Sequence, residues 1–366
     1  MKIIIKNALP INIQQENTLL FEVQATYSVQ IPKIKRLKNV FVTNNGLVLK
    51  NGILNAKSGL NLKTKKDHVF YIPYWKKAFE QFLVCKFGKS IPSISLKNKT
   101  YVVIHSKWLN YSFWITEYLQ RLIRVEQSMG LKDVVLLYPE EWDAVPYITE
   151  SLQAFNIEIC RIPGGHHLFV QNLIFPEVRE ATSCFLPEQL KLVRNRLLDE
   201  AKKRSLLVNI PNKIYLTRGK NVKRAIANED ALQQCFLKHG FAVVSFENLS
   251  IWDQIMYINH VDILFTNHGA GFSNVLFMEP GKIALEFLET DFAHYANPFP
   301  HWKLAAAVDV HYAYQLCDSD KTKHIPYKPL KITTGDERIE HVDRNITVNI
   351  AELEKNIKFC EDYLSK

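Results

Sequence analysis

The chain has 366 residues, of which 47% are hydrophobic, 23% charged and 11% aromatic. Such a composition is typical of a globular protein and excludes a disordered or collagen-like chain, while the length favours two α/β domains over a single core. The formal net charge of +9 indicates an anionic partner, and nucleic acid, an acidic polysaccharide, an anionic membrane and a nucleotide diphosphate all qualify.

The cysteines and the apolar runs narrow the class of protein further. The six cysteines lie far apart and form no CxxC pair, so neither zinc-site spacing nor a dense disulfide framework is predicted. Lys6 interrupts the apolar start of the chain and Pro10 follows, so no secretory signal is recognised. No uninterrupted apolar run approaches about 18 residues, and no transmembrane helix is predicted. We therefore expect a cytoplasmic protein.

The first half of the chain changes character near residue 100. Residues 1–100 are expected to be rich in short strands and Asn-Gly turns, with a helix near 75–87. An apolar run at 101–104 then predicts a buried strand, and a helix is expected from about 111 to 129, ending at Gly130. The elements that follow are a strand at 134–138, a helix at 147–155 and a strand at 157–160. This βαβαβ order is typical of a parallel sheet covered by helices.

The alternation restarts after a connecting helix at 187–204. Strands are predicted at 214–217, 242–246, 263–266, 283–287 and 308–314, and helices at 228–238, at 251–259, after Gly271 and at 350–364. We therefore predict two sequential doubly wound domains. Their bounds are 1–186 for the N-terminal domain, with a β-rich extension at 1–100 and a Rossmann-like core at 101–176, then 187–348 for the C-terminal domain and 349–366 for a terminal helix.

The most informative segment is a strand that ends in a glycine-rich turn opening a helix, DILFTNHGAGFSNVLFM over residues 262–278. Glycine lets the backbone pass close to a ligand, and a helix start presents free N–H groups and partial positive charge. The carboxyl end of such a strand is also where open α/β sheets bind ligands. The turn therefore predicts a diphosphate site. Its residues are His268, Gly269, Ala270, Gly271 and Asn274.

Other polar residues are expected to border the same site. Arg218 follows the first strand of this half, and its guanidinium fork fits phosphate oxygens. Glu286 ends a later strand, where acidic residues of dinucleotide folds accept hydrogen bonds from ribose hydroxyls. An ordinary surface or strand-edge position is the alternative for each of them. The candidate donor site is completed by Arg224, Asn228 and Glu229.

The run YLTR…R…NE…GF.VV.FE.LS..DQI…DIL..NHGAG.SN.LFM.PGK..LEF, over about 214–287, resembles glycosyltransferase family 61. The resemblance implies a GT-B fold, with two Rossmann-like domains facing a cleft, here preceded by a β-rich segment. It also implies a nucleotide-sugar donor, usually a UDP-sugar, in the C-terminal domain and inversion at the anomeric carbon. The family's Asn-Tyr-x-His-Trp…Leu-x-Arg-Leu motif corresponds to residues 110–122, where Phe113 replaces the family's histidine.

An inverting transfer needs a base for the acceptor hydroxyl, aligned substrates and stabilisation of charge on the departing diphosphate. The glycine-rich turn with Arg218 and Arg224 meets the last need without a metal, so no metal or other cofactor is expected. Glu117, one helical turn after Phe113 on the same face, is the first candidate for the base, and His105 is the second. A solvated helix position is the alternative for Glu117.

Several competing classes lack their signatures. An esterase needs a Gly-x-Ser-x-Gly elbow, a P-loop ATPase needs a Walker A string, and both are absent. No basic stripe with interleaved aromatics indicates nucleic-acid binding. Asp318-Ser319-Asp320 is interpreted as a loop rather than a metal motif. A catalytically degenerate nucleotide-sugar-binding protein stays open, because Phe113 replaces a histidine.

We therefore expect a bacterial hexosyl- or pentosyltransferase that acts on a glycan or a lipid-linked saccharide in capsule, exopolysaccharide or lipopolysaccharide synthesis. The acceptor would then lie at the inner membrane surface. The basic charge favours peripheral contact with anionic lipid there. Nucleic acid is not expected as a partner.

Overall fold

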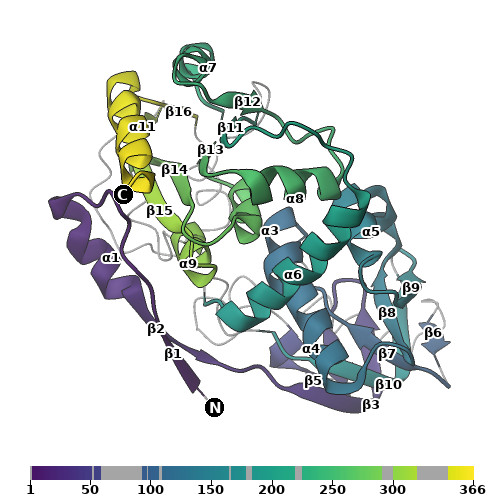
Figure 1. Ribbon diagram of the computed structural model, residues 1–366. Coiled ribbons are helices and arrows are strands. Elements are labelled where there is room, and N and C mark those ends of the chain that lie inside the picture. The colour runs from purple at the N-terminus through teal and green to yellow at the C-terminus, as the bar shows by residue number, and fades with distance from the viewer. Residues whose placement is uncertain are drawn as a thin grey trace. The chain divides into compact units, whose positions relative to one another are not determined.

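The computed structural model in Figure 1 describes residues 2–51, 53–58, 93–96, 98–106, 109–164, 166–178, 184–218, 225–290, 300–319 and 345–366. The helix predicted near 75–87 lies outside these residues. The chain folds as two compact units, one made of residues 1–3 and 28–197 and the other of residues 4–27 and 198–366. These units differ from the predicted domain bounds, because residues 4–27 pack with the C-terminal half.

The first unit is built on an eight-stranded mixed sheet, in the order β5-β4-β3-β10-β7-β8-β9, with β6 beside β10. Its strands are β3 (Ile34–Thr43), β4 (Val48–Lys50), β5 (Ile53–Leu54), β6 (Ser93–Leu96), β7 (Thr100–Val103), β8 (Val134–Pro139), β9 (Glu158–Ile162) and β10 (His167–Pro176). Strands β7, β8 and β9 run parallel, as the βαβαβ pattern predicts. Strand β10 was not predicted, yet it joins this parallel part to the antiparallel β3.

The helix predicted at 111–129 is present, and its middle is a π-helix. It consists of α3 (Tyr111–Phe113), the π-helical η3 (Trp114–Tyr118) and α4 (Leu119–Met129). The Asn110 side chain caps its start by accepting a hydrogen bond from the Phe113 N–H at 2.8 Å. Gly130 ends it with φ 73°, a conformation that favours glycine. The other helices of this unit are η2 (Ala56–Ser58), η4 (Glu140–Ala144), α5 (Pro146–Leu152) and α6 (Pro187–Arg204), the last of which continues into the second unit.

A buried arginine on α4 ties the helix to the ends of two strands. Arg121 is 1% exposed, and its Nε and Nη2 donate to the Pro176 carbonyl at 2.9 and 2.7 Å. Its Nη1 donates to the Ile104 carbonyl just after β7. Burial lowers the pKa of Arg121 to about 10, so the guanidinium stays charged at neutral pH. The side chain therefore satisfies carbonyl groups where β7 and β10 end.

The second unit is built on a six-stranded sheet, in the order β12-β11-β13-β14-β15-β16. Its strands are β11 (Lys213–Leu216), β12 (Ala242–Val244), β13 (Ile263–Asn267), β14 (Ile283–Glu289), β15 (His311–Ser319) and β16 (Ile346–Thr347). All pairings are parallel except that of β15 with β16. The five predicted strands are confirmed within one or two residues at most ends. Asp318 and Ser319, interpreted as part of a loop, instead end β15.

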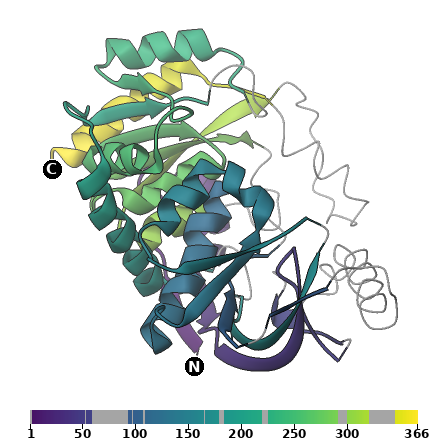
Figure 2. The ribbon, with the colours of Figure 1, turned by 90° about the vertical axis from the view of Figure 1, so that its right-hand side faces the viewer.

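In the described residues after 204, the helices of the second unit are α7 (Glu229–Lys238), α8 (Ile251–His260), η5 (Ala270–Phe277), α9 (Pro300–Ala307) and α11 (Ile350–Leu364). The element predicted after Gly271 is the 3-10 helix η5 rather than an α-helix. The terminal helix α11 belongs to this unit and packs beside α7 (Figure 2). A salt bridge of 3.1 Å between Lys238 and Glu354 joins the two helices. The aromatic core beneath them includes Tyr215, Phe236, Phe241, Phe265 and Phe287.

Residues 4–27 pack against α9 and β15. This segment contains η1 (Gln15–Asn17) and α1 (Thr18–Ala25), between the paired strands β1 (Lys2–Lys6) and β2 (Thr26–Gln30). The Trp302 indole N–H donates to the Ala8 carbonyl at 2.7 Å, and the Phe21 ring meets Trp302 edge-on at 5.0 Å. Asn12 exchanges two hydrogen bonds with the backbone of Tyr314. Nothing in the sequence pattern predicted this position.

Two further findings concern the described part of the chain. No helix there is long and apolar enough to span a bilayer. The five cysteines there are free thiols, namely Cys160, Cys184, Cys235, Cys317 and Cys360.

The buried contacts of Arg121 predict a large stability cost for its removal. In the variant Arg121→Met, the carbonyl groups of Ile104 and Pro176 lose their donor inside the protein. We expect a loss of roughly 3 kcal/mol in the free energy of unfolding, measured by urea denaturation. The control is Arg161→Met, because Arg161 is 52% exposed in its pair with Asp143. A midpoint for Arg121→Met no lower than that of the control would contradict a structural role.

Candidate active site

The glycine-rich turn lies at the carboxyl end of β13 and is fixed by backbone geometry. The His268 N–H donates to the Phe287 carbonyl of the neighbouring strand at 3.1 Å. Gly269 follows with φ 151° and ψ −174°, a region open almost only to glycine. Helix η5 then starts at Ala270, and its first N–H groups have no partner within the helix. The sequence thus places a helix start at the edge of a parallel sheet.

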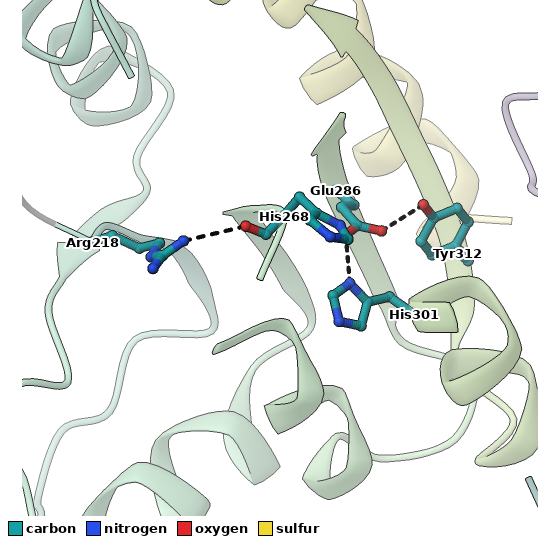
Figure 3. Close-up of polar contacts among 5 residues, drawn as sticks. All are labelled: Arg218, His268, Glu286, His301 and Tyr312. Atoms are coloured by element: carbon teal, nitrogen blue, oxygen red, sulfur yellow. Dashed lines mark hydrogen bonds and ion pairs between the residues drawn. The ribbon is translucent and has the colours of Figure 1, made fainter. Parts of the chain in front are cut away.

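Behind this turn lies a buried carboxylate with three hydrogen-bond donors (Figure 3). Glu286, on β14, is 1% exposed. Its Oε1 contacts Nδ1 of His268 at 2.6 Å and Nδ1 of His301 on α9 at 2.5 Å. Its Oε2 accepts a hydrogen bond of 2.7 Å from the Tyr312 hydroxyl on β15. Four separate elements therefore meet at one carboxyl group.

The charges of this cluster follow from its contacts. Burial by itself would raise the pKa of the Glu286 carboxyl, but the adjacent imidazoles of His301 and His268 outweigh it and hold the pKa well below its ordinary value. Burial and the nearby Glu286 charge raise the pKa of the Tyr312 phenol well above its usual range. Glu286 is therefore ionised at neutral pH, and Tyr312 remains a neutral donor.

The ionised carboxylate also assigns the histidine tautomers. A carboxylate only accepts hydrogen bonds, so both Nδ1 atoms in contact with Oε1 carry a proton. The remaining variable is the proton on Nε2 of each ring, which determines whether His268 or His301 is charged.

The same three residues are of the types that bind metals, and their spacing tests that possibility. Ligands at about 2.0–2.1 Å from a zinc ion stand roughly 3 Å or more from one another. The observed separations of 2.5 and 2.6 Å between the imidazole nitrogens and Oε1 are hydrogen-bond lengths instead. In this structure His268, Glu286 and His301 therefore form a hydrogen-bonded network.

A second group with ligand types lies between α7 and α11. It consists of Cys235, His239 and Glu354. Glu354 Oε1 is already in contact with Lys238 Nζ at 3.1 Å and with His239 Nε2 at 3.7 Å. The packing of α7 against α11 accounts for this arrangement. That the protein needs no metal stays a prediction from the sequence.

The structure brings some of the predicted donor-site residues together. Arg218 Nη1 donates to the carbonyl oxygen of His268 at 3.4 Å, so the guanidinium lies at the turn (Figure 3). A Cβ built on Gly271 would meet nothing within 4 Å, so the backbone there borders open space. Asn274 is 2% exposed and its Nδ2 donates to the Gly271 carbonyl at 3.0 Å, so it supports the turn from inside.

Asn228 and Glu229 are used within the fold. Glu229 is 4% exposed. Its carboxylate accepts hydrogen bonds from the Tyr215 and Thr217 hydroxyls and the Gln233 amide. Asn228 forms two hydrogen bonds with the backbone of Val348, at 2.8 and 3.0 Å. The geometry favours structural roles for both residues.

Of the other predicted donor-site roles, that of Arg224 stays a prediction, and that of Glu286 meets a competing set of contacts. Arg224 lies outside the described residues. Glu286 is within the site, but both its oxygens are engaged by protein donors, so a ribose contact would have to displace one of them.

Both base candidates lie in the interior of the first unit. His105 is 0% exposed, its Nε2 lies 2.9 Å from the Asn44 carbonyl, and burial lowers its pKa to about 4. It is therefore neutral and packs against Trp142. Glu117 is 1% exposed in the π-helix, where its charge raises the pKa of Arg121 against the effect of burial. π-helical turns are frequent at functional sites, so Glu117 stays the better candidate.

Sequence reasoning missed His301 and Tyr312. Tyr312 falls within a predicted strand, where a tyrosine is ordinary, and His301 lies in a short apolar helix with no motif around it. Both residues are recognised as part of the site only because their side chains form hydrogen bonds with Glu286 on β14. No signal in the sequence alone could have found them.

One comparison with known proteins bears on this site. Residues 111–285 match the family model described as Glycosyltransferase 61, a stretch that includes Arg218 and the glycine-rich turn and ends one residue before Glu286. A search of curated proteins found no match. The family match, over just under half of the chain, supports the glycosyltransferase 61 family for this protein and with it a glycosyltransferase activity between a sugar donor and an acceptor.

Proposed function

We propose that the protein is an inverting glycosyltransferase that uses a nucleotide-sugar donor, with a UDP-sugar as the first candidate. The observation that carries the proposal is the turn at the end of β13. There Gly269 has a conformation open almost only to glycine, Gly271 borders open space, and Arg218 donates to the same turn. A diphosphate needs backbone N–H groups and a guanidinium, and this turn offers both. The family match supports the transfer of a sugar.

The fold, the mechanism and the setting of this enzyme are proposed from further observations. Two α/β units, each with parallel strands in its sheet, support a GT-B arrangement. A hydrogen-bonded Glu286 network supports a mechanism without a metal. The charge of +9 supports contact with anionic lipid. A cytoplasmic enzyme of bacterial surface polysaccharide synthesis is part of the same proposal. Its acceptor would be a glycan or a lipid-linked saccharide.

In this mechanism the acceptor hydroxyl loses its proton to a base. Glu117 is the proposed base and His105 the second choice, although both are buried. The alternative function is nucleotide-sugar binding without transfer, which Phe113 keeps open. Slow hydrolysis of the nucleotide-sugar by the purified protein would favour a glycosyltransferase over a protein that only binds the donor.

The proposed function predicts selective binding of one nucleoside diphosphate. UDP, GDP, CMP and ADP, with their common sugar conjugates, are titrated by calorimetry with and without EDTA. We expect UDP to bind most tightly and EDTA to leave the Kd unchanged. If none of the nucleotides binds, the donor-site proposal is wrong. If EDTA abolishes binding, the metal-free mechanism is wrong.

Gly271 tests whether a ligand approaches the backbone of the turn. The change Gly271→Ala adds a methyl group that meets no protein atom within 4 Å, so Tm should not fall. If the diphosphate passes over this backbone, the methyl group occupies part of its space and the Kd for UDP rises at least tenfold, a cost of about 1.4 kcal/mol. Gly164→Ala is the matched control, since its Cβ also meets nothing. Equal Kd values for the two variants would show that the ligand does not pass over Gly271.

Arg218 tests the contact with phosphate. The change Arg218→Ala removes a bidentate donor whose hydrogen bonds to a charged group contribute roughly 1.5–3 kcal/mol, so the Kd for UDP should rise by about ten- to a hundredfold. Uridine lacks the phosphates, and its weaker binding should not change. The control is Arg204→Ala, an arginine exposed on α6. An effect of the same size on uridine would show a general disturbance of the site instead.

A further inference from the structure

The Glu286 network contains a charge that must be balanced. An ionised carboxylate removed from water is stable only beside compensating positive charge. Among the described residues, the contacts of Glu286 are the imidazoles of His268 and His301 and the neutral hydroxyl of Tyr312. The compensating proton therefore resides on an imidazole, in addition to the Nδ1 protons that both rings already carry.

The two imidazoles differ in their access to water. The side chain of His268 is 16% exposed and that of His301 is 9% exposed. The ring of His301 also stacks on Phe272, with 4.9 Å between ring centroids and 19° between the planes. Because burial in apolar surroundings disfavours the charged form, His268 carries the proton at lower cost.

The position of His268 gives this charge a use. His268 is the residue immediately before Gly269, so its backbone belongs to the turn that supports the donor-site proposal. Its ring donates through Nδ1 to Glu286, and Nε2 lies on the other edge of the ring. Figure 3 shows Arg218 and Glu286 on opposite sides of His268, in one row. Arg218 therefore contacts the backbone of His268 on one side, and Glu286 holds the ring of His268 on the other.

We propose that His268 acts as an imidazolium held in place by Glu286, and that its Nε2–H donates a charge-assisted hydrogen bond to the departing diphosphate. This rests on the proposed function. When the bond between the anomeric carbon and the diphosphate oxygen breaks, its electron pair leaves on that oxygen. The acceptor oxygen forms the new bond to the anomeric carbon and gives its proton to the base. The imidazolium offsets the charge on the leaving oxygen without itself losing a proton.

The direction of the pH dependence follows from this role. Among the described residues, the charged and titratable groups in recorded contact with His268 or with Glu286 are Arg218 after β11, Glu286 on β14, His301 on α9 and the neutral Tyr312 on β15. Glu286 favours the imidazolium, whereas Arg218 opposes it. An imidazole loses its charge as pH rises through the neutral range. The contribution of His268 to diphosphate binding is therefore present at low pH and lost as pH rises.

The first test compares UDP binding by the wild type and by His268→Gln from pH 5.5 to 8.5. Glutamine keeps a neutral donor, and the ionisation of free UDP affects both proteins equally. We expect the variant to bind about tenfold more weakly at low pH, with the two Kd values converging as pH rises. His260→Gln, an exposed histidine at the end of α8, is the matched control. A ratio of Kd values independent of pH overturns the proposal.

The variant His301→Gln tests which of the two imidazoles carries the charge. We expect this protein to keep the pH dependence of the wild type. If the dependence disappears with His301→Gln and persists with His268→Gln, the charge belongs to His301 and the proposal is wrong.

A second test does not depend on UDP. The charge of His268 is read from its ring ¹⁵N shifts in the free protein, with His268→Gln giving the assignment. We expect a charged ring at pH 6.5, and a titration moved to lower pH by Glu286→Gln, which removes the compensating carboxylate. A neutral ring at pH 6.5 overturns the proposal. If the ring is charged but UDP does not bind at any pH, the nucleotide site is wrong and the assigned charge state stands.

Discussion

An ionised carboxylate inside a sheet is the constraint on which the rest of the second unit depends. Glu286 lies in β14, between β13 and β15, where water cannot reach it. Its partners must therefore come from neighbouring elements. Tyr312 pairs with Ala284 in the sheet, two residues before Glu286, so its side chain points to the same face. The turn after β13 supplies His268, and α9 supplies His301.

Distant parts of the chain hold these donors in place. Trp302 follows His301 on α9, and its indole N–H donates a hydrogen bond to the Ala8 carbonyl. Tyr314 lies two residues after Tyr312 on β15, and its carbonyl accepts a hydrogen bond from the Asn12 side chain. Phe21 packs against both Trp302 and Tyr314, with ring centroids 5.0 and 5.2 Å apart. The segment 4–27 thus braces the two elements that supply His301 and Tyr312, although it is far from them in sequence.

What could be predicted from the sequence was local. Apolar runs and helical periodicity predicted the strands around β13 and β14, and the glycines around His268 predicted the turn, because both depend on neighbouring residues. The partners of Glu286 depend on which strands lie side by side, so a ribose contact was as reasonable from the sequence as the internal network. For the same reason Glu229, which binds Tyr215 and Thr217, was assigned to a ligand.

Arg121 in the first unit and Glu286 in the second are both buried charges, and they differ in the kind of group that holds them. Arg121 is a buried cation held by backbone carbonyl groups, which do not titrate, and its pKa of about 10 keeps it charged throughout the neutral range. Glu286 is a buried anion held by two imidazoles and a phenol, which are ionisable side chains. The first pairing fixes a fold whatever the pH. The second pairing consists of side chains that can gain or lose protons, and it lies directly behind the glycine-rich turn that contains His268.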